Sequence, residues 1–230
     1  MFGQSSYFCC RGSGVKHCQD TVYFRETGDF GIYSLADGVN SREYSHIGAK
    51  AVQRAIADHF EEIPDCVFEA SLPELQMKLI EIIRNVLYNL CRDRFSPEDY
   101  ASTLLLLFVS KSRGRYRCVH IGDGLIAKEK KDGSFAVISH PQNGMTKQST
   151  FTTAHSNLER YMRMDEGSLQ DVRNLYLFTD GAINPFYEHG KLTKNCEDFL
   201  KGNPTLFYRV LKQMEIRDDH SMIRIGIEEA

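Results

Sequence analysis

Residues 103–138 read TLLLLFVSKSRGRYRCVHIGDGLIAKEKKDGSFAVI, and they carry most of the information about fold class. The stretch divides into four short runs rich in apolar, β-branched and aromatic residues, which glycine or Asp-Gly turns separate. The predicted strands are Thr103–Val109, Tyr116–Ile121, Leu125–Lys130 and Phe135–Ile138. Consecutive short strands of this kind favour antiparallel sheets over a repeating βαβ unit.

Two amphipathic helices are predicted before this stretch. Apolar residues fall largely on one face over Ser45–Glu62 and again over Pro73–Arg92, whose proline suits the first helical turn. Further strands are expected at 22–24, 30–36, 175–178 and 222–227, with another helix at 204–213. Strands, then paired helices, then more strands predict an α+β fold with antiparallel sheets.

Composition narrows the class of protein. The 230 residues suffice for one large domain, and no repeat or linker divides them, so we expect a single domain over 1–230. A net charge of −3 does not favour nucleic acid as a partner. The longest apolar run, Leu104–Val109, is far shorter than the roughly 20 residues that cross a bilayer, which predicts no membrane partner. Seven scattered cysteines without a Cys-x-x-Cys pair, and no secretory signal pattern, favour a cytoplasmic protein with reduced thiols.

Four Asp-Gly pairs begin at Asp37, Asp123, Asp132 and Asp180. Asp-Gly alone is a favourable turn, because glycine accepts positive φ and aspartate tolerates it, and Asp132 fits that interpretation between two strands. Asp37 and Asp180 differ, since each directly follows an apolar strand. A carboxylate at the end of a buried strand is costly unless it is paired or binds a cation.

Other aspartates could converge with these two. Asp20 precedes the strand at 22–24, and Asp218 and Asp219 directly precede the last strand. Carboxylates and carbonyls without a His/Cys cluster select hard cations such as Mg²⁺ or Mn²⁺ over zinc. Periodicity alone does not show that these residues meet.

Five aspartate-containing segments follow one another along the chain. They are Cys18-Gln-Asp20, Leu35-Ala-Asp-Gly38, His120-Ile-Gly-Asp123, Phe178-Thr-Asp-Gly181 and Arg217-Asp-Asp-His-Ser221. Their order is the one seen in the metal-dependent protein phosphatases of the 2C type, and the chain resembles that family over about residues 12–227. The Cys-Gln-Asp form and His140-Pro-Gln-Asn-Gly144 are more similar to the bacterial-type branch than to the animal one.

The resemblance implies a fold and a reaction. The fold is a four-layer α-β-β-α sandwich, in which helices flank two antiparallel sheets and the metals lie at one end. The activity is that of a hydrolase, a serine/threonine phosphoprotein phosphatase opposing a kinase pathway. Two ions, Mn²⁺ or Mg²⁺, would activate a bridging water that attacks phosphorus in line, without a covalent enzyme intermediate.

The same resemblance implies the metal ligands. Asp37 would bridge both metals, and the Gly38 carbonyl would ligate one of them. Asp180 and Asp218 would complete the second metal site.

Two further aspartates take roles by resemblance. Asp20 would act on the metal-bound waters, either as a ligand or from just outside the ligand set. Asp123 is similar to the ligand of a third, weaker metal that many relatives bind.

Three positions depart from the family pattern. The arginine that commonly holds the substrate phosphate, five residues before Asp20, is Val15 here, so Lys16 and Arg11 become the nearby candidates. The glutamate that often precedes Asp20 is Gln19, and a histidine found in some relatives is Val39. Protonation of the leaving group would then fall to a metal-bound water.

Two alternative functions stay open. The departures at Val15, Gln19 and Val39 motivate a catalytically weak, phosphatase-like regulatory or binding module. The retained aspartates argue against that alternative. Metal-dependent hydrolysis of small phosphate esters ranks last, because the sequence has no Gly-rich nucleotide loop.

Overall fold

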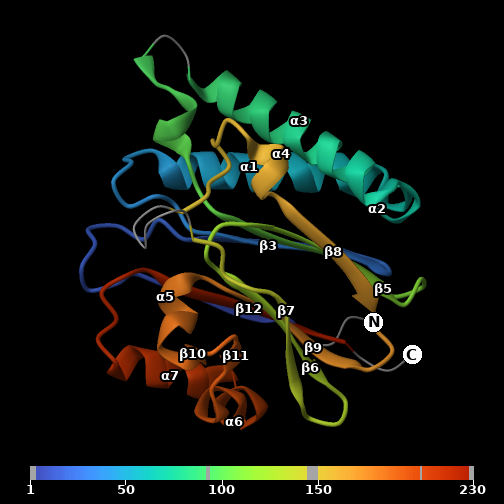
Figure 1. Cartoon of the computed structure of the whole chain (residues 1–230), viewed down its shortest axis with the longest axis vertical. Helices are drawn as coiled ribbons and strands as arrows, with labels where there is room; N and C mark the ends of the chain where they lie inside the picture. Colours follow the sequence, from blue (N-terminus) through green and yellow to red (C-terminus); the bar gives the residue numbers. More distant parts are fainter. Residues whose placement is uncertain (1–3, 92–93, 144–149, 203, 228–230) are drawn as a thin grey trace.

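The computed structural model describes residues 4–91, 94–143, 150–202 and 204–227. Two five-stranded antiparallel sheets stack on each other, and helices cover the outer face of each (Figure 1). This arrangement confirms the four-layer α-β-β-α sandwich. The segment His140–Gly144 lies partly outside the described residues, as does Arg92 at the end of the second predicted helix.

The first sheet has the strand order β2-β3-β4-β5-β8. Its strands are β2 (Thr21–Thr27), β3 (Phe30–Ala36), β4 (Leu104–Ser110), β5 (Arg115–Ile121) and β8 (Arg163–Ser168). Every residue of β3 and β4 is buried, because helices lie on one face and the second sheet on the other. That double burial explains why both strands are apolar along their whole length instead of alternating.

The second sheet has the order β1-β12-β9-β6-β7. Its strands are β1 (Ser6–Cys10), β12 (His220–Gly226), β9 (Val172–Phe178), β6 (Leu125–Lys130) and β7 (Phe135–Ser139). Neither β1 nor β8 was predicted. Both are edge strands with exposed residues, and β8 carries no run of apolar residues of the kind that marks a strand in a sequence.

The helices form the two outer layers (Figure 1). The layer over the first sheet holds α1 (Ser45–Glu62), α2 (Pro64–Glu69), α3 (Leu72–Cys91) and α4 (Leu158–Tyr161). The other layer holds α5 (Asp180–Ile183), α6 (Lys194–Gly202) and α7 (Pro204–Gln213), together with the 3-10 helix η3 (Asn184–Phe186) and the hairpin of β10 (Tyr187–Glu188) and β11 (Lys191–Leu192). A second 3-10 helix, η2 (Pro97–Tyr100), leads into β4. Within the described part of the chain, no helix is both long and apolar enough to cross a bilayer.

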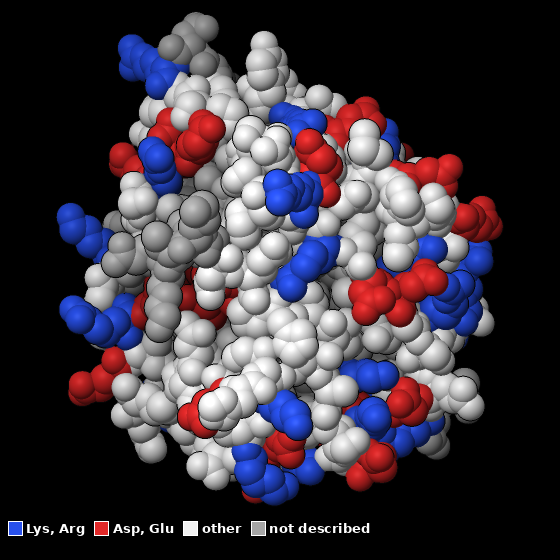
Figure 2. Space-filling model, in the orientation of Figure 1, with Lys and Arg blue, Asp and Glu red and all other residues white. Residues whose placement is uncertain are grey.

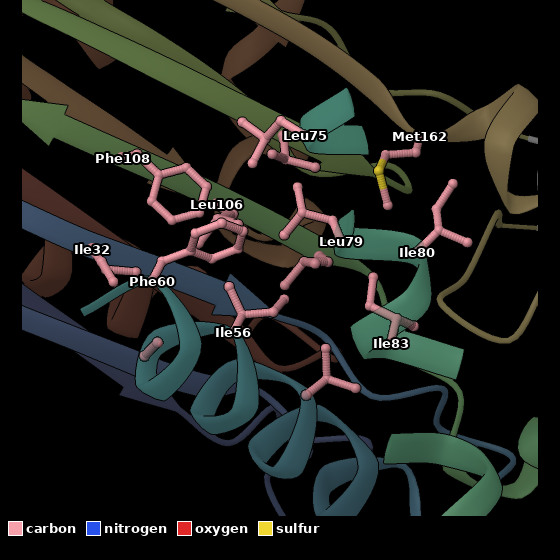
Figure 3. Packing of buried hydrophobic residues seen from close by; sticks show 14 of the residues in the cluster. Ile32, Ile56, Phe60, Leu75, Leu79, Ile80, Ile83, Leu106, Phe108 and Met162 are labelled. Atoms are coloured by element: carbon pink, nitrogen blue, oxygen red, sulfur yellow. The ribbon is translucent and has the colours of Figure 1, made fainter. Parts of the chain in front are cut away.

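A core of buried apolar side chains fixes α1 and α3 on the first sheet (Figure 3). This cluster contains Ile56 and Phe60 from α1, Leu79 from α3 and Phe108 from β4. All four side chains are fully buried. Full burial of side chains of this size contributes about 1.5–3 kcal/mol each. This packing holds the second half of α1 against α3 and β4.

The turn between β5 and β6 carries the chain from one sheet to the other. Gly122 in this turn has φ of +112°, and a Cβ there would lie 2.6 Å from the Thr103 side chain, so glycine is required. Asp123 therefore lies between the two sheets. The Asp132-Gly133 turn behaves as predicted, since it joins β6 to β7 within one sheet and Gly133 has φ of +81°.

Candidate functional site

Aspartates from both sheets line one cleft of about 540 Å³. Asp37 follows β3 in the first sheet, while Asp180 follows β9 and Asp218 precedes β12 in the second. Asp123 reaches the same cleft from the crossover between the sheets. The structure thus brings together four residues that lie far apart in the sequence. Figure 2 shows acidic side chains in a hollow at the left of the view, where Figure 1 places the loops at this end of the sandwich.

Strand register explains the convergence. Thr21 pairs with Ala36, which places Asp20 beside Asp37. Phe178 in β9 pairs with both Leu125 in β6 and Met222 in β12. The segments that follow Phe178 and that precede Leu125 and Met222 therefore lie at the same edge of the second sheet.

The loop after β3 is held by reciprocal hydrogen bonds. The Asp37 backbone N–H donates to Thr103 Oγ1 over 2.9 Å, and the Thr103 N–H donates to the Asp37 carbonyl over 2.8 Å. Gly38 forms a backbone bridge with Ser102, and a Cβ on Gly38 would lie 2.6 Å from Ser45 Oγ. Ser102 and Thr103 therefore hold the loop after β3 through backbone and side-chain contacts.

The adjacent aspartates before β12 have different partners. Asp218 lines the cleft and accepts a 2.7 Å hydrogen bond at Oδ1 from the Asn40 side-chain amide. Asp219 is fully buried and accepts hydrogen bonds from the backbone N–H groups of Gly12, over 2.9 Å, and Gln19, over 2.6 Å. Asp219 therefore anchors the N-terminal loop, while Asp218 faces the site.

Asp180 and Asp123 are both shifted towards the protonated form. Burial raises the pKa of Asp180 to about 7, and the negative charges of Asp123 and Asp218 add to this effect. Asp180 Oδ1 accepts a 2.6 Å hydrogen bond from the Gly181 N–H. Burial also raises the pKa of Asp123, whose Oδ2 accepts a 2.5 Å hydrogen bond from the Thr150 hydroxyl.

Asp20 is buried and is not among the residues that line the cleft. Its Oδ2 accepts a 3.1 Å hydrogen bond from the Thr179 hydroxyl, while the buried Oδ1 has no hydrogen-bonding partner among the described residues. Burial raises the pKa of Asp20 well above its usual value. Burial is also the main reason why the pKa of Asp37 lies far above its ordinary range, and repulsion from the charges of Asp20 and Asp180 raises it further.

These residues fit a hard divalent cation. Several buried carboxylates close together repel one another, and a cation would relieve that repulsion. Within the described ranges, no three His, Cys, Asp or Glu side chains lie close enough to hold one ion between them. Mg²⁺ does not need such a cage, since it keeps several waters and is held by one or two carboxylates. The unpartnered Asp20 Oδ1 adds a buried acceptor beside the cluster.

The basic residues predicted to hold phosphate lie elsewhere. Arg11 and Lys16 are exposed on the N-terminal loop, and neither lines the cleft. The Arg11 guanidinium donates instead to the Lys16 carbonyl over 3.1 Å. Among the residues that the structure describes, the cation that lines the cleft is Arg42, five residues after Asp37.

The sequence analysis also missed three polar neighbours of the aspartates, which are Asn40, Thr150 and Thr179. Asn40 and Thr179 stand within three residues of a predicted ligand, so proximity along the chain could have indicated them. Thr150 carries no such signal, because its contact with Asp123 spans 27 positions.

Solved structures share this fold at low sequence identity, and no curated protein matches the sequence. The phosphatase Stp1 from Staphylococcus aureus superposes with a TM-score of 0.74 at 13% identity, covering 100% of this chain and 96% of that one. The catalytic domain of the serine/threonine protein phosphatase PstP, solved with two manganese ions, gives 0.70 at 15% identity, covering 98% of each chain. RsbX in complex with magnesium gives 0.65 at 11% identity, covering 99% of each chain.

Sequence comparison identifies the family. The family described as Protein phosphatase 2C matches residues 12–206, a span that contains Asp20, Asp37, Asp123 and Asp180. The match covers most of the chain, and the solved structures have the same two-sheet fold. This chain belongs to the protein phosphatase 2C family.

Proposed function

We propose that this chain is a metal-dependent phosphatase that removes phosphate from serine and threonine residues of proteins. One observation carries the proposal: strand ends from both sheets place Asp37, Asp123, Asp180 and Asp218 around a single cleft in a member of the phosphatase 2C family. A regulatory module that only binds phosphoproteins would not need this concentration of buried carboxylates.

Mn²⁺ or Mg²⁺ is the cofactor that suits these ligands. Asp37 and the Gly38 carbonyl would hold two ions together with Asp180 and Asp218, and Asp123 would hold a third, weaker one. When bound there, the ions supply a water activated at neutral pH and offset charge on the phosphoryl oxygens.

The protein's own residues orient this site. Thr103 fixes the backbone of Asp37, and Asn40 fixes one oxygen of Asp218. Asp20 is held at one oxygen by Thr179, which leaves Oδ1 to accept a hydrogen bond or a proton from water. Val39 also lines the cleft, in the place where some relatives have a histidine, so it offers no side-chain acid to the leaving group.

The partners follow from this reaction. The substrate is a phosphorylated protein, and the opposing activity is a serine/threonine kinase pathway. All seven cysteines are free thiols, which supports a reducing compartment such as the cytoplasm. We further propose that residues 1–230 act as one catalytic domain.

The test compares hydrolysis of a phosphothreonine peptide by the wild type and by Asp180→Ala, each in Mn²⁺ and in EDTA. We expect wild-type turnover that requires Mn²⁺, and a loss on the order of 100-fold or more in kcat/KM for the variant. Asp132→Ala is the matched control, since it alters an Asp-Gly turn at the far end of β6.

Either result of this test is informative. Mn²⁺-dependent turnover that survives in Asp132→Ala and is lost in Asp180→Ala supports the phosphatase and its site. A folded wild type that turns over no phosphopeptide in Mn²⁺ or Mg²⁺ refutes the proposal and favours the phosphatase-like binding module. Faster turnover of nucleotides than of phosphopeptides would favour small phosphate esters as substrates.

A further inference from the structure

The cleft has a strong excess of negative charge. Besides the four aspartates, Glu98 from η2 lines it, and among the described lining residues Arg42 is the one cation. A phosphate dianion entering such a cleft needs a positive partner on the side away from the metal-binding aspartates. The position where relatives commonly carry that arginine is Val15, which does not line the cleft.

The backbone of Arg42 is fixed by hydrogen bonds. Its N–H donates to the Val39 carbonyl over 2.8 Å, which closes a turn directly after Gly38. Its own carbonyl accepts from the Gln19 side-chain amide over 2.7 Å and from the Ser45 hydroxyl over 3.0 Å. The loop that carries Arg42 is therefore tied both to the segment before Asp20 and to the first turn of α1.

Gln19 donates side-chain hydrogen bonds to the loop of Arg42, which a glutamate could not do. Its buried Nε2 donates both to the Arg42 carbonyl and, over 2.8 Å, to Ser45 Oγ. A carboxylate accepts hydrogen bonds but has none to donate when ionised. The residue that departs from the family pattern at position 19 is thus the one that donates a hydrogen bond to the backbone of Arg42.

The side chain of Arg42 is free to turn towards a ligand. Its Nη1 lies 3.4 Å from Asp99 Oδ1, and the two side chains are 45% and 30% exposed. Asp99 is already bound at Oδ2 by the Ser96 N–H over 2.9 Å, and this bond is the first cause of its lowered pKa. A long, solvent-exposed ion pair contributes little to stability, so its loss costs little.

We propose that Arg42 binds the phosphoryl group of the substrate, and that Gln19 positions the loop from which Arg42 reaches it. The inference rests on the proposed function and adds the residue that takes the place of the arginine missing at Val15. The planar guanidinium offers a fork of N–H donors that matches two phosphoryl oxygens, a geometry that Lys16 could not supply even from within reach.

The experiment measures binding of inorganic phosphate by calorimetry in saturating Mg²⁺, and separately kcat and KM for a phosphothreonine peptide. Arg42→Ala should weaken phosphate binding by about 10- to 100-fold and raise KM by a similar factor, because charge-assisted hydrogen bonds to the anion are lost. Arg42→Lys should recover part of the affinity. The affinity for Mg²⁺ and the melting temperature should not change.

Arg113→Ala is the matched control. Arg113 is also a partly exposed arginine paired with aspartate and glutamate, and it lies in the β4–β5 turn at the end of these strands away from the cleft. Gln19→Glu should weaken phosphate binding in the same direction as Arg42→Ala, although less strongly, while the protein keeps its fold and its Mg²⁺ affinity.

Three results would overturn the inference. They are an Arg42→Ala variant whose phosphate affinity stays within twofold of wild type, a loss that appears in Lys16→Ala or Arg11→Ala instead, and a wild type that binds no phosphate in Mg²⁺. A wild type that binds phosphate through Arg42 but turns over no phosphopeptide would refute the proposed function and leave the role of Arg42 intact.

Discussion

Asn40 donates a 2.7 Å hydrogen bond from its side-chain amide to Oδ1 of Asp218, and both residues line the acidic cleft. The Asp219 N–H donates to the same oxygen over 3.0 Å. One oxygen of Asp218 is thus held in place by two donors. The loop after β3 and the start of β12 are linked through this carboxylate.

We expect Asn40→Ala to weaken Mn²⁺ binding by on the order of 10-fold, because hydrogen-bonding partners that orient a metal ligand have effects of this size. Isothermal titration calorimetry of the metal-free protein measures the change. Asn195→Ala, an exposed asparagine on α6, serves as the control and should bind Mn²⁺ like the wild type. Equal affinities of Asn40→Ala and wild type would show that Asp218 needs no support from the loop.

In the metal-free protein, Asp180 should lower the stability of the fold as pH rises through neutrality. The folded-state pKa of Asp180 is about 7, well above the ordinary value of 3.8, so the folded protein retains a proton that the unfolded chain has released. Stability from this group is complete below about pH 4 and is lost as pH rises through about 7. His120 acts in the opposite direction below about pH 6.5, because burial lowers its pKa to about 3.

The measurement is therefore the melting temperature in EDTA between pH 6.5 and 8, compared between the wild type and Asp180→Asn, because His120 and Cys9 titrate alike in both proteins. We expect the melting temperature of the wild type to fall relative to that of Asp180→Asn as pH rises from 6.5 to 8. Saturating Mn²⁺ should reduce the slope, since bound metal favours the ionised carboxylates. Identical pH dependence of the wild type and Asp180→Asn in EDTA would contradict the assignment.

Leu79→Ala should destabilise the fold by about 2–5 kcal/mol, because the change leaves a cavity between α3 and the first sheet. Leu79 is fully buried in the cluster of Figure 3, whereas Met77 on the same helix is 62% exposed. Met77→Ala, the control, should change the unfolding free energy by less than about 0.5 kcal/mol. Urea unfolding of both variants makes the comparison, and equal losses would mean that this cluster does not hold α3.

Cys9 should be the cysteine that iodoacetamide alkylates first at pH 7.5. It is exposed, and its Sγ lies 3.6 Å from Cys18 Sγ, whose hydrogen bond lowers the pKa of Cys9 to about 7. Cys118 and Cys196 should resist, since both are buried and burial raises the pKa of each to about 12. Mass spectrometry after a short exposure identifies the modified peptide.

Cys18→Ala supplies the control for that reaction. Without the Cys18 thiol, the pKa of Cys9 should rise and its alkylation at pH 7.5 should slow severalfold. Unchanged labelling of Cys9 in this variant would show that exposure alone, and not the Cys18 contact, governs its reactivity.

Local patterns in the sequence were sufficient for most of the secondary structure. The helix predicted at Ser45–Glu62 and the strand at 30–36 have the predicted bounds, because each is amphipathic or continuously apolar over its full length. The aspartate segments also stood out in the sequence, since each lies beside a strand in a fixed order. These features depend on neighbours within a few residues, which a sequence displays directly.

Tertiary contacts determined the rest. The edge strands β1 and β8 exist because partners far along the chain pair with them. The division of roles between Asp218 and Asp219 depends on Gly12 and Gln19, about 200 positions away. The position of Arg42 at the cleft, which Lys16 and Arg11 do not line, likewise depends on how two sheets and a helix meet. A linear sequence contains the residues of such a site but not the distances between them.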